Sequence, residues 1–214
     1  MSRYLLQKSS SGLRLVDRFS HQHPLQIKFS GGRFGERLKK GSSKKELIAK
    51  AVGAKPDLRV IDCTAGLGRD SFLLAALGCK VTMFERSRVL SLLLQDALDN
   101  ALDDDRTKEI ATRVRLFCGE ATELLTCLQD IPDVILIDPM FPERKKSAMV
   151  KGEMQFLQRF LGKDEDAASL LQCALGTGVK RVVLKRPLSA DESGNQRPSH
   201  SVKGKSSRFD IYLQ

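Results

Sequence analysis

The sequence has no apolar run of the roughly 18 residues that a membrane-spanning helix needs. Its first twelve residues, MSRYLLQKSSSG, also lack the apolar stretch of a secretory signal peptide. Both absences argue against a membrane or secreted protein, and we expect a cytoplasmic one.

Cysteine and histidine are too few and too scattered to indicate a metal site or a disulfide framework. The five cysteines are an odd number, and none of them forms a CxxC pair. The three histidines do not combine with these cysteines at ligand spacing. We therefore expect reduced thiols, many of them buried, and no bound metal.

The net charge of +10 is distributed unevenly along the chain. Residues 1–53 hold 12 Lys/Arg against 3 Asp/Glu, residues 54–140 hold 10 against 15, and residues 141–214 hold 14 against 8. A solvated basic surface would explain the total by itself. Two basic ends around an acidic middle, however, favour a polyanionic partner, with nucleic acid first.

Strand and helix patterns alternate from residue 58 onward, which predicts an α/β fold. The expected strands cover 58–63, 80–85, 113–119, 132–138, 180–187 and 207–213. Short connections imply a Rossmann-like, mostly parallel sheet with helices on both faces. The polar segment 188–206 has no helical period, so we expect the last strand to return antiparallel at the sheet edge.

The 214 residues suit one domain with a small appendage. We expect residues 1–53 to form a basic N-terminal extension and residues 54–214 to form the main domain. In the extension, 13–19 and 25–29 could be short strands, 31–41 reads as a flexible basic loop, and 42–53 predicts a helix.

A candidate ligand-binding loop follows the first strand of the main domain. Gly66 and Gly68 would let the backbone approach a ligand, and the acid Glu85 ends the next strand, where it could accept hydrogen bonds from a ribose diol. Asp62 and Asp70 would repel a pyrophosphate but attract a sulfonium and an ammonium. The pattern therefore favours S-adenosylmethionine (SAM) over NAD or a purely structural turn.

The third strand ends near Glu120, at the loop that flanks the adenine in sheets of this kind. Its carboxylate could accept a hydrogen bond from the adenine amine, or it could be the first-turn acid of the next helix. The sequence does not choose between these two interpretations.

A second candidate site, Asp-Pro-Met-Phe, follows the fourth strand. Asp138, Pro139 and Phe141 match the Asp-Pro-x-Phe pattern of amino-methyltransferases. Asp138 and the Pro139 carbonyl would accept hydrogen bonds from an exocyclic amine, and Phe141 would stack on its base. The alternative is an ordinary turn at the end of a strand.

Cations after this motif and on the fifth strand are candidate contacts for RNA phosphates. The alternative for the cluster after the motif is a solvated helix start. The candidates are Arg144, Lys145, Lys146, Lys151, Lys185 and Arg186.

The segments DCTAGLGRD, ERS, DPMFPERKKSAMVKGEM, KRVVLKRP and RFDIY together resemble the bacterial small-subunit (16S) ribosomal RNA (guanine-N2)-methyltransferases of the J type. The resemblance covers roughly residues 25–214. It implies a class I SAM-dependent methyltransferase domain over residues 54–214 that modifies one guanine near the 3′ end of the rRNA. The cofactor contacts that it implies are Arg69, Asp70, Glu85, Arg86, Glu120, Ala121 and Asp138.

Three functions stay open at this point. The first is N2-methylation of a guanine in small-subunit rRNA, either naked or in the small ribosomal subunit, by a monomeric enzyme. The second is N6-methylation of adenine in DNA or RNA, because the same motif serves that amine. The third is a non-catalytic RNA-binding or assembly module that keeps SAM only as a ligand of the fold.

Overall fold

The computed structural model of the protein describes residues 2–39, 46–140, 152–162, 166–190 and 196–214. The helices in these ranges are α1 (Gly32–Lys39), α2 (Leu47–Val52), α3 (Arg69–Ala76), α4 (Arg88–Leu102), α5 (Lys108–Ala111), α6 (Ala121–Thr126), α7 (Gly152–Leu161) and α8 (Ala167–Gly176). The strands are β1 (Tyr4–Ser9), β2 (Gly12–Asp17), β3 (Arg59–Asp62), β4 (Lys80–Glu85), β5 (Val114–Cys118), β6 (Val134–Ile137), β7 (Arg181–Pro187), β8 (His200–Lys203) and β9 (Ser207–Leu213).

Among the described residues, seven strands form one sheet in the order β5-β4-β3-β6-β7-β9-β8. Strands β3 to β7 pair in parallel, and β9 runs antiparallel between β7 and β8. The chain thus winds outward from β3 in one direction and from β6 in the other. The switch point between β3 and β6 is where sheets of this type bind ligands, at the carboxyl ends of the strands.

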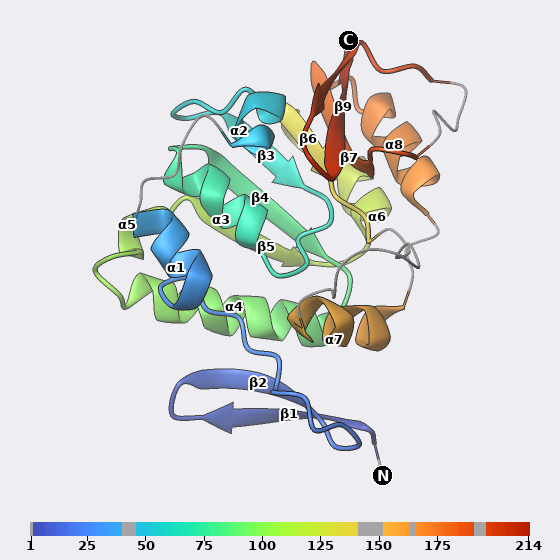
Figure 1. Ribbon diagram of the computed structural model, residues 1–214. Helices are drawn as coiled ribbons and strands as arrows, with labels where there is room; N and C mark the ends of the chain where they lie inside the picture. The colour runs from blue at the N-terminus through green and yellow to red at the C-terminus, as the bar shows by residue number, and fades with distance from the viewer. Residues whose placement is uncertain (1, 40–45, 141–151, 163–165, 191–195) are drawn as a thin grey trace.

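Helices cover both faces of the sheet (Figure 1). Helices α3 and α4 pack on one face, and α6 and α8 pack on the other. Alternate strand residues supply the two cores, because successive side chains of a strand point to opposite faces. One core includes Val60, Leu136 and Val183, and the other includes Ile61, Ile135 and Val182. Complete burial of each of these side chains contributes about 2 kcal/mol.

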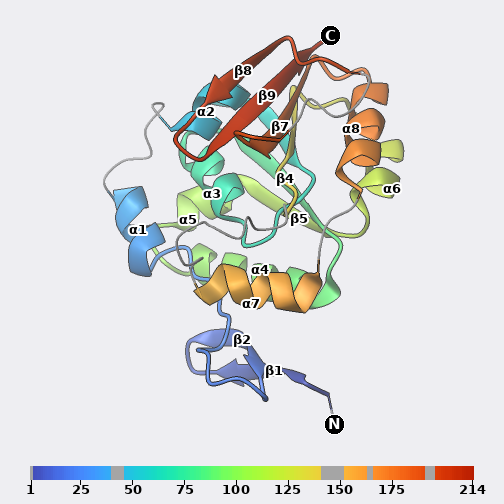
Figure 2. The same ribbon diagram turned by 45° about the vertical axis from the view of Figure 1, so that its right-hand side comes forward.

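The hairpin β1–β2 packs on the side of α4 that faces away from the sheet (Figures 1 and 2). The Leu13 N–H donates a hydrogen bond of 2.8 Å to Asp96 of α4, and the ring centroid of Tyr4 lies 4.9 Å from that of Phe160 in α7. Leu15 is buried in the same core cluster as α3 and α4. The N-terminal extension therefore shares a core with the rest of the chain, and its division from the main domain at residue 53 stays a prediction.

The N-terminal prediction was confirmed for the strand at 13–19, which overlaps β2, and for the helix at 42–53, which contains α2, but two other segments differ. Segment 31–41 was expected to be a loop but contains α1, because Phe34 buries its ring near Phe29 and Phe72. Segment 25–29 was expected to be a strand but forms only an isolated bridge between Leu25 and Leu15.

The prediction for the main domain is confirmed in its alternation and in its parallel core. The last strand, β9, is antiparallel as expected, but it is not outermost. The short strand β8 lies beyond it, inside the segment that was expected to be irregular. The polar, half-exposed sequence of β8 gave no strand pattern.

Candidate active site

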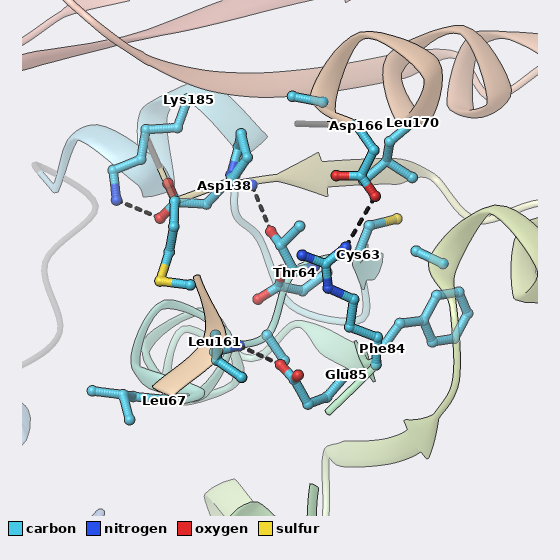
Figure 3. Close-up of a pocket in the computed structure, with 18 of the residues that line it drawn as sticks. Cys63, Thr64, Leu67, Phe84, Glu85, Asp138, Leu161, Asp166, Leu170 and Lys185 are labelled. Carbon is cyan, nitrogen blue, oxygen red and sulfur yellow. Dashed lines mark hydrogen bonds and ion pairs between the residues drawn. The ribbon is translucent and has the colours of Figure 1, made fainter. Parts of the chain in front are cut away.

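A cavity of about 430 Å³ lies beside the switch point, at the carboxyl ends of the parallel strands (Figure 3). This volume is in the range of small-molecule sites. Residues that the sequence predicts for cofactor binding or catalysis line it: Asp62, Gly66, Arg69, Asp70, Glu85, Arg86, Glu120, Ala121, Asp138 and Pro139. The fold thus brings the two candidate sites together into one cavity.

Asp62, the last residue of β3, is only 3% exposed. Its carboxylate accepts hydrogen bonds from the Ser71 hydroxyl at 2.6 Å and from the Thr64 N–H at 3.1 Å. Burial raises the pKa of Asp62 to about 6, although both hydrogen bonds oppose the rise. A buried carboxylate gains from a nearby positive charge, so Asp62 suits the cationic end of a ligand.

Two glycines with positive φ shape the loop after β3. At Gly66 (φ 57°) a Cβ would meet only the Thr64 carbonyl oxygen, at 3.7 Å, so the backbone is open to the cavity. At Gly68 (φ 67°) a Cβ would lie 2.8 Å from the Leu94 side chain in the core. Gly68 is the N-cap of α3 and is not among the described residues that line the cavity. The absence of a side chain at Gly68 lets α3 begin close to α4.

Glu85 ends β4, the strand next to β3, and is 6% exposed. One carboxylate oxygen accepts a hydrogen bond from the Ser87 N–H at 2.8 Å, and the other accepts one from the Gly66 N–H at 3.1 Å. Burial raises the pKa of Glu85 to about 7 against these hydrogen bonds. Each oxygen keeps a second lone pair, so the ionised group can also accept from the two hydroxyls of a diol.

Asp138 follows β6 and is held from two sides (Figure 3). Its backbone N–H donates to the Thr64 hydroxyl at 2.6 Å. Its Oδ2 accepts from Lys185 Nζ at 2.5 Å, and the same ammonium lies 3.4 Å from Asp70 Oδ2. Thr64 is therefore a functional candidate that the sequence did not indicate. Lys185 is a second candidate, for which the sequence predicted a different role.

Lys185 was expected to contact RNA phosphates, but its ammonium points into the cavity. Burial lowers the pKa of Lys185, yet attraction to Asp138 and Asp70 outweighs burial and raises that pKa above its ordinary value. Lys185 is therefore a permanent cation inside an acidic cavity.

Arg186 points to the opposite face of β7 from Lys185, as neighbouring strand residues do. It is 8% exposed, and its Nε lies 3.7 Å from Asp210 Oδ2. The Nε of Arg208 donates to the same carboxylate at 2.9 Å. A guanidinium buried in this cluster presents little surface to an RNA phosphate, so its geometry favours a structural role.

Two ion pairs connect residues at the rim of the cavity to α7 and to the start of α8. Arg69 at the start of α3 pairs with Glu153 of α7 at 2.6 Å. Arg86 after β4 pairs with Asp166 before α8 at 3.0 Å, and Figure 3 shows this pair at Asp166. Leu161 of α7 also lines the cavity. All four charged side chains are more than a third exposed, so each pair contributes about 0–1 kcal/mol.

Glu120 and Ala121 line the cavity at the start of α6, just after β5. Within the described part of the chain, the Glu120 side chain makes no N-cap hydrogen bond to α6, although Glu120 is the N-cap residue. Its carboxylate lies at the cavity and at the start of α6, so the adenine interpretation and the first-turn interpretation both stay predictions.

The remaining predicted residues lie outside the described part of the chain. They are Phe141, Arg144, Lys145, Lys146 and Lys151. Their predicted roles in stacking the base and binding phosphates stay predictions.

The cavity's charges match SAM better than a dinucleotide. Among the described residues, six carboxylates line it against three cations, and each of these cations is paired with a carboxylate. A pyrophosphate would be repelled here, whereas a ligand with a sulfonium and an ammonium would be attracted. The open backbone at Gly66 and the inward carboxylate of Glu85 complete a site that SAM fits.

The described residues contain neither a candidate metal centre nor a candidate membrane span. Among them, His, Cys, Asp and Glu side chains form no cluster of three or more that could hold a metal ion. No helix of the described part combines the length and apolarity needed to cross a membrane.

The strand order, the reversed strand beside one edge and the acidic cavity at the switch point define a Rossmann-like class I methyltransferase. A solved SAM-dependent methyltransferase from Neisseria gonorrhoeae shares this fold. It superposes with a TM-score of 0.76 at 36% sequence identity, over 97% of this chain and 81% of that one.

Sequence comparison identifies the family. A family model described as "Putative SAM-dependent methyltransferase" matches residues 1–214. Relatives named ribosomal RNA small subunit methyltransferase J include one from Thioalkalivibrio sulfidiphilus, 45% identical over 89% of this chain and 76% of its own length. Another, from Dechloromonas aromatica, is 44% identical over 98% of this chain and 87% of its own. The chain belongs to this family of SAM-dependent methyltransferases, and SAM is its methyl donor.

Proposed function

We propose that this protein transfers a methyl group from SAM to the exocyclic N2 amine of one guanine in small-subunit (16S) ribosomal RNA. One observation carries the proposal: Asp138 of the Asp-Pro-x-Phe motif lies in the same cavity as Asp62 and Glu85. The motif indicates an amine acceptor, and the relatives' name supplies the class of RNA.

The cofactor half of the site follows from the geometry of three strand ends. We propose that Glu85 accepts the ribose hydroxyls, that Asp62 faces the cationic end, and that Gly66 admits the ligand close to the backbone. Glu120 and Ala121 would contact the adenine. When bound, SAM supplies an electrophilic methyl group.

The amine half of the site must overcome a poor nucleophile, because the lone pair of an exocyclic amine is delocalised into the base. We propose that the Asp138 carboxylate and the Pro139 carbonyl accept its two N–H groups, which localises the lone pair and orients it. Phe141 would stack on the guanine. Positioning is then the main catalytic contribution, and no general base is needed before attack because the product ammonium is acidic.

RNA phosphates would be held by cations that follow the motif in sequence, Arg144, Lys145, Lys146 and Lys151. Since bacterial rRNA is made and assembled in the cytoplasm, the proposal implies a cytoplasmic protein.

A labelling experiment tests the proposal directly. The protein is incubated with methyl-labelled SAM and with unmodified small-subunit rRNA, either naked or in small subunits, and the RNA is digested to nucleosides. We expect the label in N2-methylguanosine. Label in N6-methyladenosine would support the adenine alternative instead, and tight RNA binding without label on either substrate would support a non-catalytic module.

A further inference from the structure

We propose that Lys185 is a positioning residue for the reaction: by bridging Asp70 and Asp138 it holds the Asp138 carboxylate ionised and oriented into the cavity. The inference rests on the proposed function, because the group that Asp138 would hold is the amine of the substrate. Lys185 itself need not touch the substrate.

The sheet register explains why these two side chains meet. Ile137 of β6 pairs with Leu184 of β7, and Asp138 and Lys185 each come one residue later. They follow neighbouring parallel strands and point to the same face as Leu136 and Val183.

The ammonium of Lys185 is held from three directions. It lies 2.5 Å from Asp138 Oδ2, 3.4 Å from Asp70 Oδ2 and 5.8 Å from the ring centroid of Phe209, its register partner on β9. The aromatic face adds a favourable cation–π contact. A lysine fixed in this way also fixes the carboxylate oxygen to which it donates.

A cation is needed here because Asp138 lies among other acids. Asp62 and Asp70 are close enough to interact electrostatically, and repulsion from Asp138 contributes to the raised pKa of Asp62. The other charged groups that line the cavity, among the residues the structure describes, are Arg69, Glu85, Arg86, Glu120 and Asp166. Both arginines are paired with acids of α7 or the start of α8. Lys185 is thus the cation that directly offsets the acids around Asp138 within the described part of the cavity.

Ionisation decides what Asp138 can do. An ionised carboxylate only accepts hydrogen bonds, whereas a protonated one presents an O–H donor. A donor directed at the amine would compete for the lone pair that must attack the methyl group. By keeping Asp138 ionised, Lys185 would preserve its function as an acceptor.

The test compares Lys185→Met and Lys185→Arg with the wild type and with Lys180→Met. Lys180 is exposed just before β7, at the opposite end of the strand from the cavity, and serves as the matched control. For each protein, kcat is measured from pH 5.5 to 9 at saturating SAM, together with the Kd of SAM and thermal unfolding.

We expect Lys185→Met to lower kcat about tenfold or more at pH 7, with the Kd of SAM within about threefold of wild type. The difference in kcat between Lys185→Met and the wild type should shrink as pH rises, because a higher pH favours the ionised form of Asp138 even when the lysine is absent. Lys185→Arg should keep the wild-type pH profile, since it keeps the charge, and Lys180→Met should match wild type throughout.

The inference is overturned if Lys185→Met keeps the wild-type kcat and pH profile, or if its loss is equal at every pH. If Lys185→Met does not fold, Lys185→Gln replaces it, because glutamine keeps an N–H donor without the charge. Different results would overturn the proposed function and the proposed role of Lys185. A wild-type product other than N2-methylguanosine overturns the proposed function, whereas a guanine product with an unaffected Lys185→Met overturns only the role of Lys185.

Discussion

The hydroxyl of Thr64 accepts a hydrogen bond of 2.6 Å from the backbone N–H of Asp138, 74 residues later in the chain. This bond joins the loop after β3 to the segment after β6, across the switch point of the sheet. It therefore aligns the half of the cavity proposed for the cofactor with the half proposed for the amine.

Thr64→Val should weaken this alignment while preserving side-chain shape. The Asp138 N–H would lose its partner, at a cost of about 1 kcal/mol or a roughly fivefold lower kcat. Steady-state methylation assays at saturating SAM measure the effect. Thr64→Ser keeps the hydroxyl and should remain near wild type, and an equal loss in both variants would contradict the role of this bond.

SAM affinity should depend on pH through Glu85, whose pKa burial raises to about 7. Only the ionised carboxylate accepts both hydroxyls of a diol, and it is mostly ionised at pH 8 and mostly protonated at pH 6. The Kd measured by calorimetry should therefore rise about tenfold from pH 8 to pH 6.

Glu85→Gln is the control for this pH dependence. This variant should bind SAM more weakly than the wild type at pH 8. Its Kd for SAM should change little between pH 8 and pH 6, apart from a smaller contribution of Asp62, whose pKa is about 6. The same pH dependence in Glu85→Gln and wild type would rule out Glu85 as its source.

Asp210 should be important for stability. Its carboxylate is 1% exposed and lies against the guanidinium groups of Arg186 and Arg208. Asp210→Ala would leave two buried cations without this anion, which should lower the free energy of unfolding by about 3 kcal/mol or more. Urea denaturation measures this change. Asp57→Asn, which affects the exposed pair with Lys80, is the control and should change the free energy of unfolding little. An equally small change in Asp210→Ala would contradict the structural role of the cluster.

The sequence predicted the main domain well because its signals were local. Buried strands such as 58–63, 80–85 and 132–138 read as apolar runs, and the acids Asp62, Glu85 and Asp138 marked their carboxyl ends. Parallel strands bring those ends to one edge of the sheet, so one cavity followed from the alternation alone.

The position of Lys185 could not be read from the sequence in the same way. Lys185 and Arg186 are adjacent cations, and only the register of β7 against β6 shows that one enters the cavity while the other is buried with Asp210. The hydroxyl of Thr64 gave no signal either, because its partner is distant in the chain. Helix α1 was missed because contacts with Phe29 and Phe72 outweigh two glycines of low helix propensity.

Asp138 is the residue on which the proposed chemistry depends most. Asp138→Ala removes the acceptor for the amine but leaves Gly66 and Glu85 in place, so SAM binding should persist while turnover falls by about 100-fold or more. Binding of SAM is measured by calorimetry as the control. Weaker SAM binding with unchanged turnover at saturation would contradict the catalytic role of Asp138.

The most direct measurement is mass-spectrometric mapping of small-subunit rRNA from cells that lack this protein and carry either the wild type or Asp138→Ala. We predict N2-methylation of one guanine with the wild type and an unmodified guanine at that position with the variant. Complete methylation with Asp138→Ala, or no guanine whose N2-methylation depends on the wild-type protein, would contradict the proposal.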